Sequence, residues 1–387
     1  MTSIAVLTAT RAEYGLLKPV IEELNKIKEV DVRVLVTGAH LSHHQGSTYK
    51  VIEEDGIEIA AKIEILTQGD KPSDISRRMS NAITGFAEYF EIETPDALLV
   101  LGDRYETLAV CIAAMNEGIP IIHLYGGETT EGAIDEAVRH AITKMSYLHL
   151  TSTEDYRRRV IQLGEAPERV FCVGALGVEN AIKQELLSRE ELGESLNIDL
   201  NKGYAVVTYH PVTLEKNAIE AQVKALIEAM EEYNDLQYII TKANTDAGGI
   251  MVNKMLQDYA DGRENVFMFS SLGMKKYLSA VKYAEFVLGN SSSGLIEVPA
   301  FGVPTVNIGD RQKGRMKGET VIDCQASRDS IIEAIRKVRD SRFRSKAAMA
   351  VSPYGDGETV NKIVEIILSE MCGRRVDVKK RFYDLDF

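Results

Sequence analysis

The sequence has no apolar run long enough to cross a membrane. No window approaches about 18 consecutive apolar residues, and the N-terminal apolar stretch Ile4–Thr8 is far shorter than the core of a signal peptide. The four cysteines lie far apart and show neither C-x-x-C spacing nor a disulfide framework pattern. We therefore expect a cytoplasmic protein with no membrane partner, whose cysteines are buried and reduced.

Positive charge is also scarce. The 387 residues include 45 Lys and Arg against 58 Asp and Glu, which gives a formal net charge of −13. Such a surface repels phosphate chains and disfavours extended nucleic-acid binding, whereas a small anionic ligand needs only local positive potential. The basic cluster Arg374–Arg381 could be an interaction tail, and we interpret it as a solvated terminal segment.

Common cofactor and metal motifs are missing. There is no G-x-G-x-x-G after the first predicted strand, no G-x-x-x-x-G-K-[ST] and no H-E-x-x-H. The metal-like cluster Ala39–His44 has no carboxylate or cysteine partner at ligand spacing, so a loop of histidines is the better interpretation. We expect neither a cofactor nor a metal.

What the sequence does contain is an alternation of short β-branched runs with amphipathic helical stretches. This alternation is typical of parallel sheets covered by helices on both faces. A chain of 387 residues exceeds one ordinary hydrophobic core, so we expect two doubly wound α/β domains with a ligand cleft between them. The predicted strands are Ile4–Leu7, Val30–Thr37, Ala97–Leu101, Ile121–Leu124 and Val170–Val173, then Tyr204–Thr208, Gln237–Thr241, Val266–Phe269, Phe286–Leu288 and Thr305–Ile308. The clearest predicted helices are Tyr14–Lys26 and Tyr105–Asn116.

The loops after the strands of the first half hold cations and carboxylates. In open parallel sheets, ligands bind at the carboxyl ends of the strands. Arg11 and Glu13 lie in the first predicted loop, and Asp103 and Arg104 follow a later strand. These loops are where we expect chemistry.

The segment Gly126–His140 is the most distinctive of the first half. It places Glu128 after a Gly-Gly turn and sets Asp135 and Arg139 one helical turn apart. A helix cap and an i,i+4 ion pair would explain these residues without any function. The number of acids beside a glycine turn nevertheless favours general acid–base chemistry.

A glycine- and serine-rich turn marks the second half. Gly289–Gly294 follows an apolar strand and opens the predicted helix Leu295–Ala300, so backbone N–H groups, hydroxyls and the helix dipole suit a diphosphate. A serine N-cap is the plain alternative. Glu297 could accept from ribose hydroxyls, as acids do in nucleotide sites, or be an ordinary helix-surface residue. The loop Gly309–Arg315 carries three cations, and His210 follows the first strand of this half.

Together these segments resemble the hydrolysing UDP-N-acetylglucosamine 2-epimerases of the bacterial sialic- and legionaminic-acid pathways. The match runs over nearly the whole chain and is carried by Arg11–Tyr14, Leu101–Arg104, Gly126–Glu128, Ile134–Lys144, Tyr209–Val212, Asn244–Gly248, Gly289–Gly294, Gly309–Arg315 and Tyr354–Gly357. The resemblance implies the GT-B architecture, with residues 1–178 as an N-terminal Rossmann-like domain and residues 179–365 as a nucleotide-binding domain. A C-terminal helix, residues 366–387, would pack back on the first domain. We also expect a homodimer or homotetramer.

By this resemblance the substrate is a nucleotide-diphosphate amino sugar. The residues implied to bind it are Arg11, Arg104, Asn244, Ser271, Leu272, Ser291, Ser292, Glu297 and Arg311. Those implied to work at the sugar are Asp103, Glu128, Asp135, Arg139 and His210. Two positions depart from the animal and non-hydrolysing relatives, because Leu16 and Tyr125 stand where those enzymes carry Lys and Glu. Lys18 is a candidate replacement for the Lys, and Glu128 or Asp103 for the Glu.

The implied reaction eliminates the nucleoside diphosphate across C1–C2 and then adds water to release the free 2-epimer. UDP-N-acetylglucosamine would give N-acetylmannosamine and UDP, and the same chemistry on UDP- or GDP-2,4-diacetamido-2,4,6-trideoxyglucose stays open. The alternatives of other classes are a GT-B glycosyltransferase and a non-catalytic sugar-nucleotide sensor. A transferase would not need the acids crowded around the loops of the first domain, which favours the epimerase.

Overall fold

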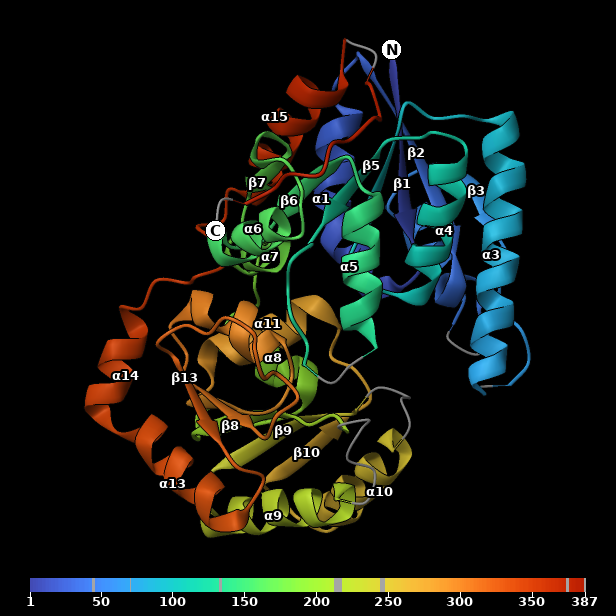
Figure 1. Ribbon diagram of the computed structural model, residues 1–387. Helices are drawn as coiled ribbons and strands as arrows, with labels where there is room; N and C mark the ends of the chain where they lie inside the picture. Colours follow the sequence, from blue (N-terminus) through green and yellow to red (C-terminus); the bar gives the residue numbers. More distant parts are fainter. Residues whose placement is uncertain are drawn as a thin grey trace. The chain divides into compact units, whose positions relative to one another are not determined.

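The computed structural model describes residues 1–43, 46–69, 71–131, 134–211, 218–243, 248–373 and 376–385. The chain divides into two compact units (Figure 1). The first comprises Met1–Glu128, Ile134–Leu176 and Gly355–Phe387, and the second comprises Gly177–Tyr354 with a short segment that begins at Thr129. The chain thus passes between the units more than once, and the boundaries 1–178 and 179–365 stay a prediction.

The first unit is built on a seven-stranded parallel sheet of order β3-β2-β1-β4-β5-β6-β7. Its strands are β1 (Thr2–Thr8), β2 (Val30–Thr37), β3 (Ile59–Ile63), β4 (Ala97–Leu101), β5 (Ile121–Leu124), β6 (Leu148–Thr151) and β7 (Val170–Cys172). Its helices are α1 (Arg11–Asn25), α2 (Tyr49–Glu54), α3 (Pro72–Ile92), α4 (Tyr105–Asn116), α5 (Asp135–Met145), α6 (Glu154–Gln162) and α15 (Thr359–Met371), with 3₁₀ turns at Gly38–Leu41 and Pro167–Arg169. The five strands predicted in this half are confirmed.

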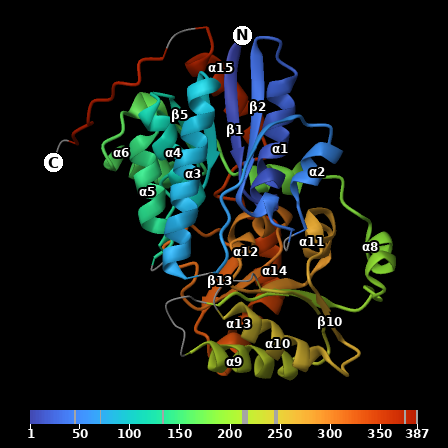
Figure 2. The same ribbon diagram turned by 90° about the vertical axis from the view of Figure 1, so that its right-hand side faces the viewer.

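Helices cover both faces of this sheet, as the alternating sequence pattern predicts. Figure 2 shows α1 and α2 on one face and α3, α4 and α5 on the other. On the first face, Leu17 of α1 and Ile363 of α15 are fully buried in one cluster. On the second, Phe86 and Phe90 of α3 are buried with Val110 of α4. Each such side chain stabilises the unit by roughly 1.5–3 kcal/mol.

The C-terminal helix differs from its predicted range of 366–387. It spans Thr359–Met371 instead, and the described residues that follow, 376–385, contain no helix. The apolar spacing that holds the helix on the sheet stops at Met371, and Gly373 follows with a positive φ of 75°. The charged run beyond it offers no apolar stripe to continue the helix.

The second unit repeats the architecture with a six-stranded parallel sheet of order β10-β9-β8-β11-β12-β13. Its strands are β8 (Tyr204–Thr208), β9 (Gln237–Thr241), β10 (Val266–Phe269), β11 (Phe286–Gly289), β12 (Thr305–Ile308) and β13 (Val321–Cys324). Its helices are α8 (Arg189–Leu196), α9 (Ile219–Glu232), α10 (Gly249–Ala260), α11 (Gly273–Tyr283), α12 (Ser293–Ile296), α13 (Arg328–Arg339) and α14 (Ser341–Ala348), and α7 (Leu176–Lys183) begins where the units meet in sequence. The five strands predicted here are confirmed.

The predicted helix Leu295–Ala300 is wrong in type. The structure has a single α-helical turn at Ser293–Ile296, followed by a 3₁₀ turn at Val298–Phe301. Pro299 has no backbone N–H, so it cannot continue an α-helical hydrogen-bond pattern from the preceding turn. A single turn carries little macrodipole, so the helix dipole contributes little to binding a diphosphate here. In the described ranges no helix is long and apolar enough to span a membrane.

Candidate active site

Arg139 is the centre of the acid cluster in the first unit. Its side chain, on α5, is only 1% exposed. Its Nε donates to Asp103 Oδ2 at 2.9 Å, and its Nη1 donates to the Glu128 carbonyl at 2.9 Å and to Glu136 Oε2 at 2.7 Å. The structure therefore brings the loop after β4, the turn after β5 and α5 together. Asp103 is the partner of Arg139 that is distant in sequence, and the i,i+4 spacing within a helix could not have revealed it.

Glu128 is held in place by a tight turn. Tyr125 and Gly127 both have positive φ, 68° and 78°, and a Cβ on Gly127 would lie 2.3 Å from the Tyr156 carbonyl oxygen. The Glu128 side chain is 5% exposed and accepts a hydrogen bond from Ser152 Oγ at 3.0 Å. Sequence reasoning missed Ser152, which follows β6, the strand next to β5 in the sheet.

Tyr125, which was predicted to replace a carboxylate of the animal and non-hydrolysing relatives, uses its hydroxyl for a structural contact. The oxygen accepts a hydrogen bond from the Leu176 backbone N–H at 2.8 Å. A bulky residue in the left-handed region costs on the order of 1–3 kcal/mol, so the surrounding packing must hold it. Leu16, at the other departing position, packs against the core. Lys18 forms an ion pair with Asp55 at 2.7 Å.

Asp135 lies in the first turn of α5 and is half-buried. Burial raises the pKa of Asp135, and the negative charge of Asp103 raises it further, while Arg139 acts in the opposite direction. Two carboxyl groups with different environments can serve as a proton donor and a proton acceptor in one site. This is the arrangement that general acid–base chemistry requires.

Arg104 and Arg11 lie at the same edge of the first sheet. Arg104 is the N-cap residue of α4, and its Nε donates to Glu106 Oε1 at 2.6 Å. Arg11 is exposed at the first position of α1. That helix begins three residues earlier than predicted, because Thr10 and Glu13 form a capping box.

The Glu13 carboxyl group is 8% exposed and accepts hydrogen bonds from the backbone of Ala9 and Thr10 at 2.8 and 2.9 Å. Burial raises the pKa of Glu13 to about 7, against these hydrogen bonds, and the charge of Glu106 adds to the increase. In the unfolded chain the group titrates near 4.5. Between pH 4.5 and about pH 7, the folded protein therefore keeps a proton on Glu13 that the unfolded chain has lost.

We expect this proton to make stability fall as pH rises from about 4.5 to about 7, and to have no further effect above that range. The contribution is at most on the order of 3 kcal/mol. Glu13→Gln keeps an acceptor oxygen for the two N–H groups and removes the titration. Urea unfolding at pH 5 and pH 8 should show the variant gaining stability relative to wild type at the higher pH. An equal difference at both pH values would contradict the assignment.

Asn290 organises the corresponding edge of the second unit. It is fully buried, its Oδ1 accepts from the His210 N–H at 2.7 Å, and its Nδ2 donates to the His210 carbonyl at 2.8 Å. Its own carbonyl accepts from Arg311 Nη1 at 3.0 Å and from Gln312 Nε2 at 2.9 Å. The predicted histidine and the predicted cation are thus fixed to one residue, whose role the sequence did not show.

The strand that ends before Asn290 requires glycine. Gly289 has a φ of 139°, and a Cβ there would lie 2.0 Å from the Thr208 carbonyl oxygen of neighbouring β8. Ser291 and Ser292 follow Asn290 directly and are both half-buried. Their hydroxyls therefore lie in the same turn as the contacts of Asn290 with His210 and Arg311, which we call the Asn290 clamp.

His210 is 8% exposed, and burial lowers its pKa to about 4, with the charge of Arg311 as a second cause. The imidazole is therefore neutral at pH 7. In the free protein it can offer a hydrogen bond to a phosphate, but the positive charge has to come from arginine.

The remaining predicted binding residues are more scattered. The Glu297 carboxylate lies against the backbone of α7, since a Cβ on Gly177 would be 2.3 Å from Glu297 Oε1, so it is not an ordinary helix-surface group. Ser271 is exposed and Leu272 is buried in the turn after β10, at the rim of the sheet. Asn244 lies outside the described residues.

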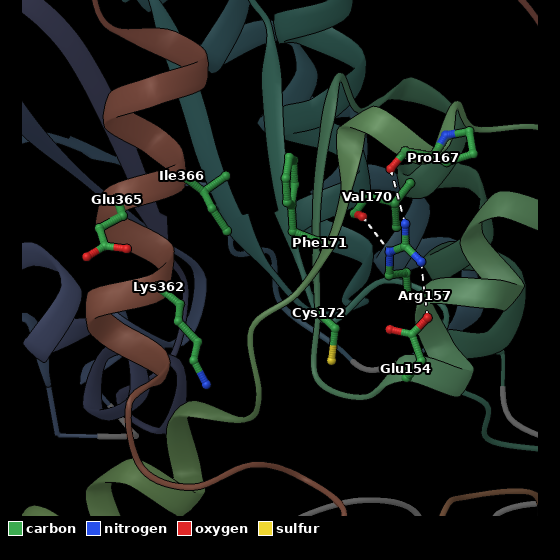
Figure 3. A pocket seen from close by; sticks show the side chains of 9 residues that line it. All are labelled: Glu154, Arg157, Pro167, Val170, Phe171, Cys172, Lys362, Glu365 and Ile366. Atoms are coloured by element: carbon green, nitrogen blue, oxygen red, sulfur yellow. Dashed lines mark hydrogen bonds and ion pairs between the residues drawn. The ribbon is translucent and has the colours of Figure 1, made fainter.

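A pocket of about 380 Å³ lies elsewhere in the first unit, between α6, β7 and α15 (Figure 3). Arg157 in its wall already donates to the Val170 and Pro167 carbonyls and to Glu154. No residue of the predicted site lines this pocket. It does contain the exposed Cys172, so the expectation of buried cysteines is wrong for that residue, whereas Cys111 is buried.

Comparison with known proteins agrees with this architecture of two parallel sheets. The crystal structure of UDP-GlcNAc 2-epimerase from Neisseria meningitidis bound to UDP-GlcNAc matches with a TM-score of 0.81 at 20% identity, over 95% of this chain and 100% of that chain. The fold is thus of the GT-B type.

The sequence comparisons identify the family. The sequence profile of UDP-N-acetylglucosamine 2-epimerase matches residues 22–368. Polysialic acid biosynthesis protein P7 of Escherichia coli is 39% identical over 387 residues, covering 100% of this chain and 98% of that protein. The GDP/UDP-N,N'-diacetylbacillosamine 2-epimerase (hydrolyzing) of Campylobacter jejuni is 38% identical over 383 residues, 99% of each chain. The chain belongs to the UDP-N-acetylglucosamine 2-epimerase family and is an enzyme.

Proposed function

We propose that the protein is a hydrolysing 2-epimerase of nucleotide sugars, which converts UDP-N-acetylglucosamine and water to N-acetylmannosamine and UDP for the synthesis of sialic-type acids. The observation that carries this proposal is the cluster in which Arg139 joins Asp103 to the turn that holds Glu128. The name of the Campylobacter jejuni relative, a hydrolysing enzyme, supports the reaction type.

The two ends of such a substrate need different chemistry, and the predicted residues fall into two corresponding sets. In the second unit, Arg311 and the neutral His210 are fixed by Asn290 beside the hydroxyls of Ser291 and Ser292, a set suited to a diphosphate. Glu297 would accept from the ribose. In the first unit, the acids around Arg139 act on the sugar.

The C2 proton has no neighbouring carbonyl to acidify it. It becomes removable only as the C1–O bond breaks and positive charge develops on C1 and the ring oxygen. One carboxylate, from Asp103 or Glu128, takes that proton while the nucleoside diphosphate leaves, and a C1–C2 double bond forms. Water then adds its oxygen to C1, and a proton reaches C2 from the opposite face to give the 2-epimer. Asp135, with its raised pKa, is suited to deliver that proton.

A second candidate is the same reaction on UDP- or GDP-2,4-diacetamido-2,4,6-trideoxyglucose. The Campylobacter jejuni relative, a GDP/UDP-N,N'-diacetylbacillosamine 2-epimerase, favours it. The two substrates differ at C4 and C6 of the sugar, far from the bonds that break. The chemistry described for Asp103, Glu128 and Asp135 is therefore common to both.

The test is to incubate the purified enzyme with each UDP-sugar in deuterated water, without added metal or nucleotide cofactor. We expect UDP and a free 2-epimer that carries deuterium at C2, because the abstracted proton exchanges with solvent before the second step. Proton NMR identifies both the sugar and the isotope. Product that keeps all of its original C2 hydrogen would rule out the elimination, and transfer of the sugar to an added acceptor would indicate a glycosyltransferase.

A further inference from the structure

The C-terminal tail is anchored by one lysine. The basic cluster Arg374–Arg381 was expected to be solvated, but the Lys380 side chain is only 21% exposed. Its Nζ donates to the Lys144 carbonyl at 2.8 Å, the Ser146 carbonyl at 2.7 Å and Glu165 Oε2 at 2.8 Å. A lysine ammonium group has three N–H donors, so each donor has an acceptor.

Two of these acceptors belong to the end of α5. Lys144 lies in the last turn of that helix, and Ser146 is its C-cap residue. The last carbonyls of a helix lack partners within the helix and carry partial negative charge, so a cation placed on them fixes and stabilises the helix end. The same helix carries Asp135 and Arg139. It has 11 residues, so its two ends are only about 16 Å apart.

The third acceptor, Glu165, makes the anchor an ionic one. Its side chain is 2% exposed and also accepts from Lys144 Nζ at 2.5 Å and from His149 Nε2 at 3.1 Å. Burial alone would raise the pKa of Glu165, but the hydrogen bonds from His149, Lys144 and Lys380 outweigh it and lower the pKa to about 2. The carboxylate is therefore ionised at neutral pH and holds both lysines.

Further contacts of the tail hold Lys380 beside the end of α5. The tail residue Tyr383 donates its backbone N–H to the Gly164 carbonyl at 3.0 Å. The Phe382 ring lies on Gly164, where a Cβ would come within 2.3 Å of it, and Lys144 Nζ is 5.0 Å from the ring centroid. In Figure 1 the tail leaves α15 and runs on past α6 towards the C-terminus. The tail is thus a docked segment of the first unit.

The buried face of α5 is tied to the loop that carries Asp103. His123 on β5 bonds the Gly102 carbonyl through Nε2 at 2.8 Å, and its Nδ1 lies 3.5 Å from Thr143 Oγ1. That hydroxyl donates to the Arg139 carbonyl at 3.0 Å. His123 is in register with His149, the partner of Glu165, on the neighbouring strand. A small movement of α5 would therefore displace Arg139 and, through His123, the loop that carries Asp103.

We propose that Lys380 is a positioning residue of this enzyme, which fixes the C-terminal end of α5 and thereby keeps Arg139 and Asp135 aligned with Asp103. The C-terminal tail is then part of the catalytic apparatus although it does not touch the substrate. This inference rests on the proposed function, in which those three residues act on the sugar.

The test is Lys380→Met, which keeps an unbranched apolar stem and removes the three donors. The matched control is Lys379→Met, because Lys379 is the exposed neighbour. We expect Lys380→Met to lower kcat roughly tenfold or more, since small misplacements of catalytic groups are costly. UDP affinity should change little, because the diphosphate and ribose contacts proposed for His210, Arg311 and Glu297 belong to the other unit. Hydrogen–deuterium exchange should rise in peptides covering Asp135–Met145, and the control should match wild type in every measurement.

Equal kcat values for the two variants, even with a lower Tm for Lys380→Met, would overturn the proposal, because the lysine would then serve stability alone. If Lys380→Met does not fold, Glu165→Gln asks the same question with Glu168→Gln as its exposed control. If wild-type enzyme turned over neither UDP-sugar, the proposed function would fail. The exchange measurement would still decide the inference, since unchanged exchange in α5 would refute the positioning role.

Discussion

Asp103→Asn is expected to lower kcat by roughly 10²–10⁴, the usual contribution of a positioned acid or base, while UDP affinity stays nearly unchanged. The carboxylate is the partner of the buried Arg139, and it contributes to the raised pKa of Asp135. Asparagine keeps the shape and one acceptor oxygen, so the loss would report on charge and basicity. Steady-state kinetics on the UDP-sugar and calorimetric titration with UDP give the two quantities.

Glu128→Gln separates the two candidate bases. If Glu128 removes the C2 proton, this variant should lose at least as much kcat as Asp103→Asn, because the amide cannot accept a proton at neutral pH. Asp155→Asn is the control, as an exposed acid on α6 of the same unit. Near-wild-type turnover in both Asp103→Asn and Glu128→Gln would remove these residues from the chemistry and leave Asp135 and His210 as candidates.

The pH dependence gives an independent check on the cluster. In Asp103→Asn the negative charge that helps to raise the pKa of Asp135 is gone, so that pKa should fall towards its ordinary value. If protonated Asp135 is needed, the alkaline limb of the residual kcat profile should move to lower pH. A limb that stays in place would mean that Asp135 is not the group that titrates.

Much of the fold was predictable from sequence, because local patterns determine it. The apolar and β-branched runs Val30–Thr37, Ala97–Leu101 and Tyr204–Thr208 became strands with the predicted bounds. Helix ends were less predictable. The start of α1 was missed although Thr10 and Glu13 have the T-x-x-E spacing of a capping box, and the extent of α12 depends on where Pro299 interrupts the turn.

The candidate site was predictable in its residue types and less so in its pairings. Arginine and carboxylate at strand ends indicated the acid cluster, but the contact between Arg139 and Asp103 joins residues 36 positions apart. Asn290 and His210 are 80 positions apart, so only the folded sheet reveals the clamp. Lys380 is the extreme case, because its charge and terminal place indicated solvent whereas its acceptors lie more than 200 residues earlier.

The second large effect is expected at Arg311. Arg311→Met should raise the Kd for UDP roughly 10- to 150-fold, the value of a charge-assisted hydrogen bond of about 1.5–3 kcal/mol. Asn290 fixes the guanidinium beside His210, so the positive charge is held ready where the diphosphate is proposed to bind. Lys313→Met is the matched control, an exposed cation in the same loop. Calorimetric titration with UDP measures both variants.

The same variant should raise the pKa of His210. Burial and the like charge of Arg311 both lower the pKa of His210 to about 4, so removing the arginine leaves burial alone. The pKa should then rise but stay below its ordinary value of about 6.5, which NMR titration of the imidazole can follow. A higher Kd together with an unchanged His210 pKa would show that Arg311 contributes to UDP binding without lying as close to His210 as its contact with Asn290 implies. An unchanged Kd would show that the charge of Arg311 does not serve the diphosphate. Its substitution would then have no more effect than that of the exposed Lys313.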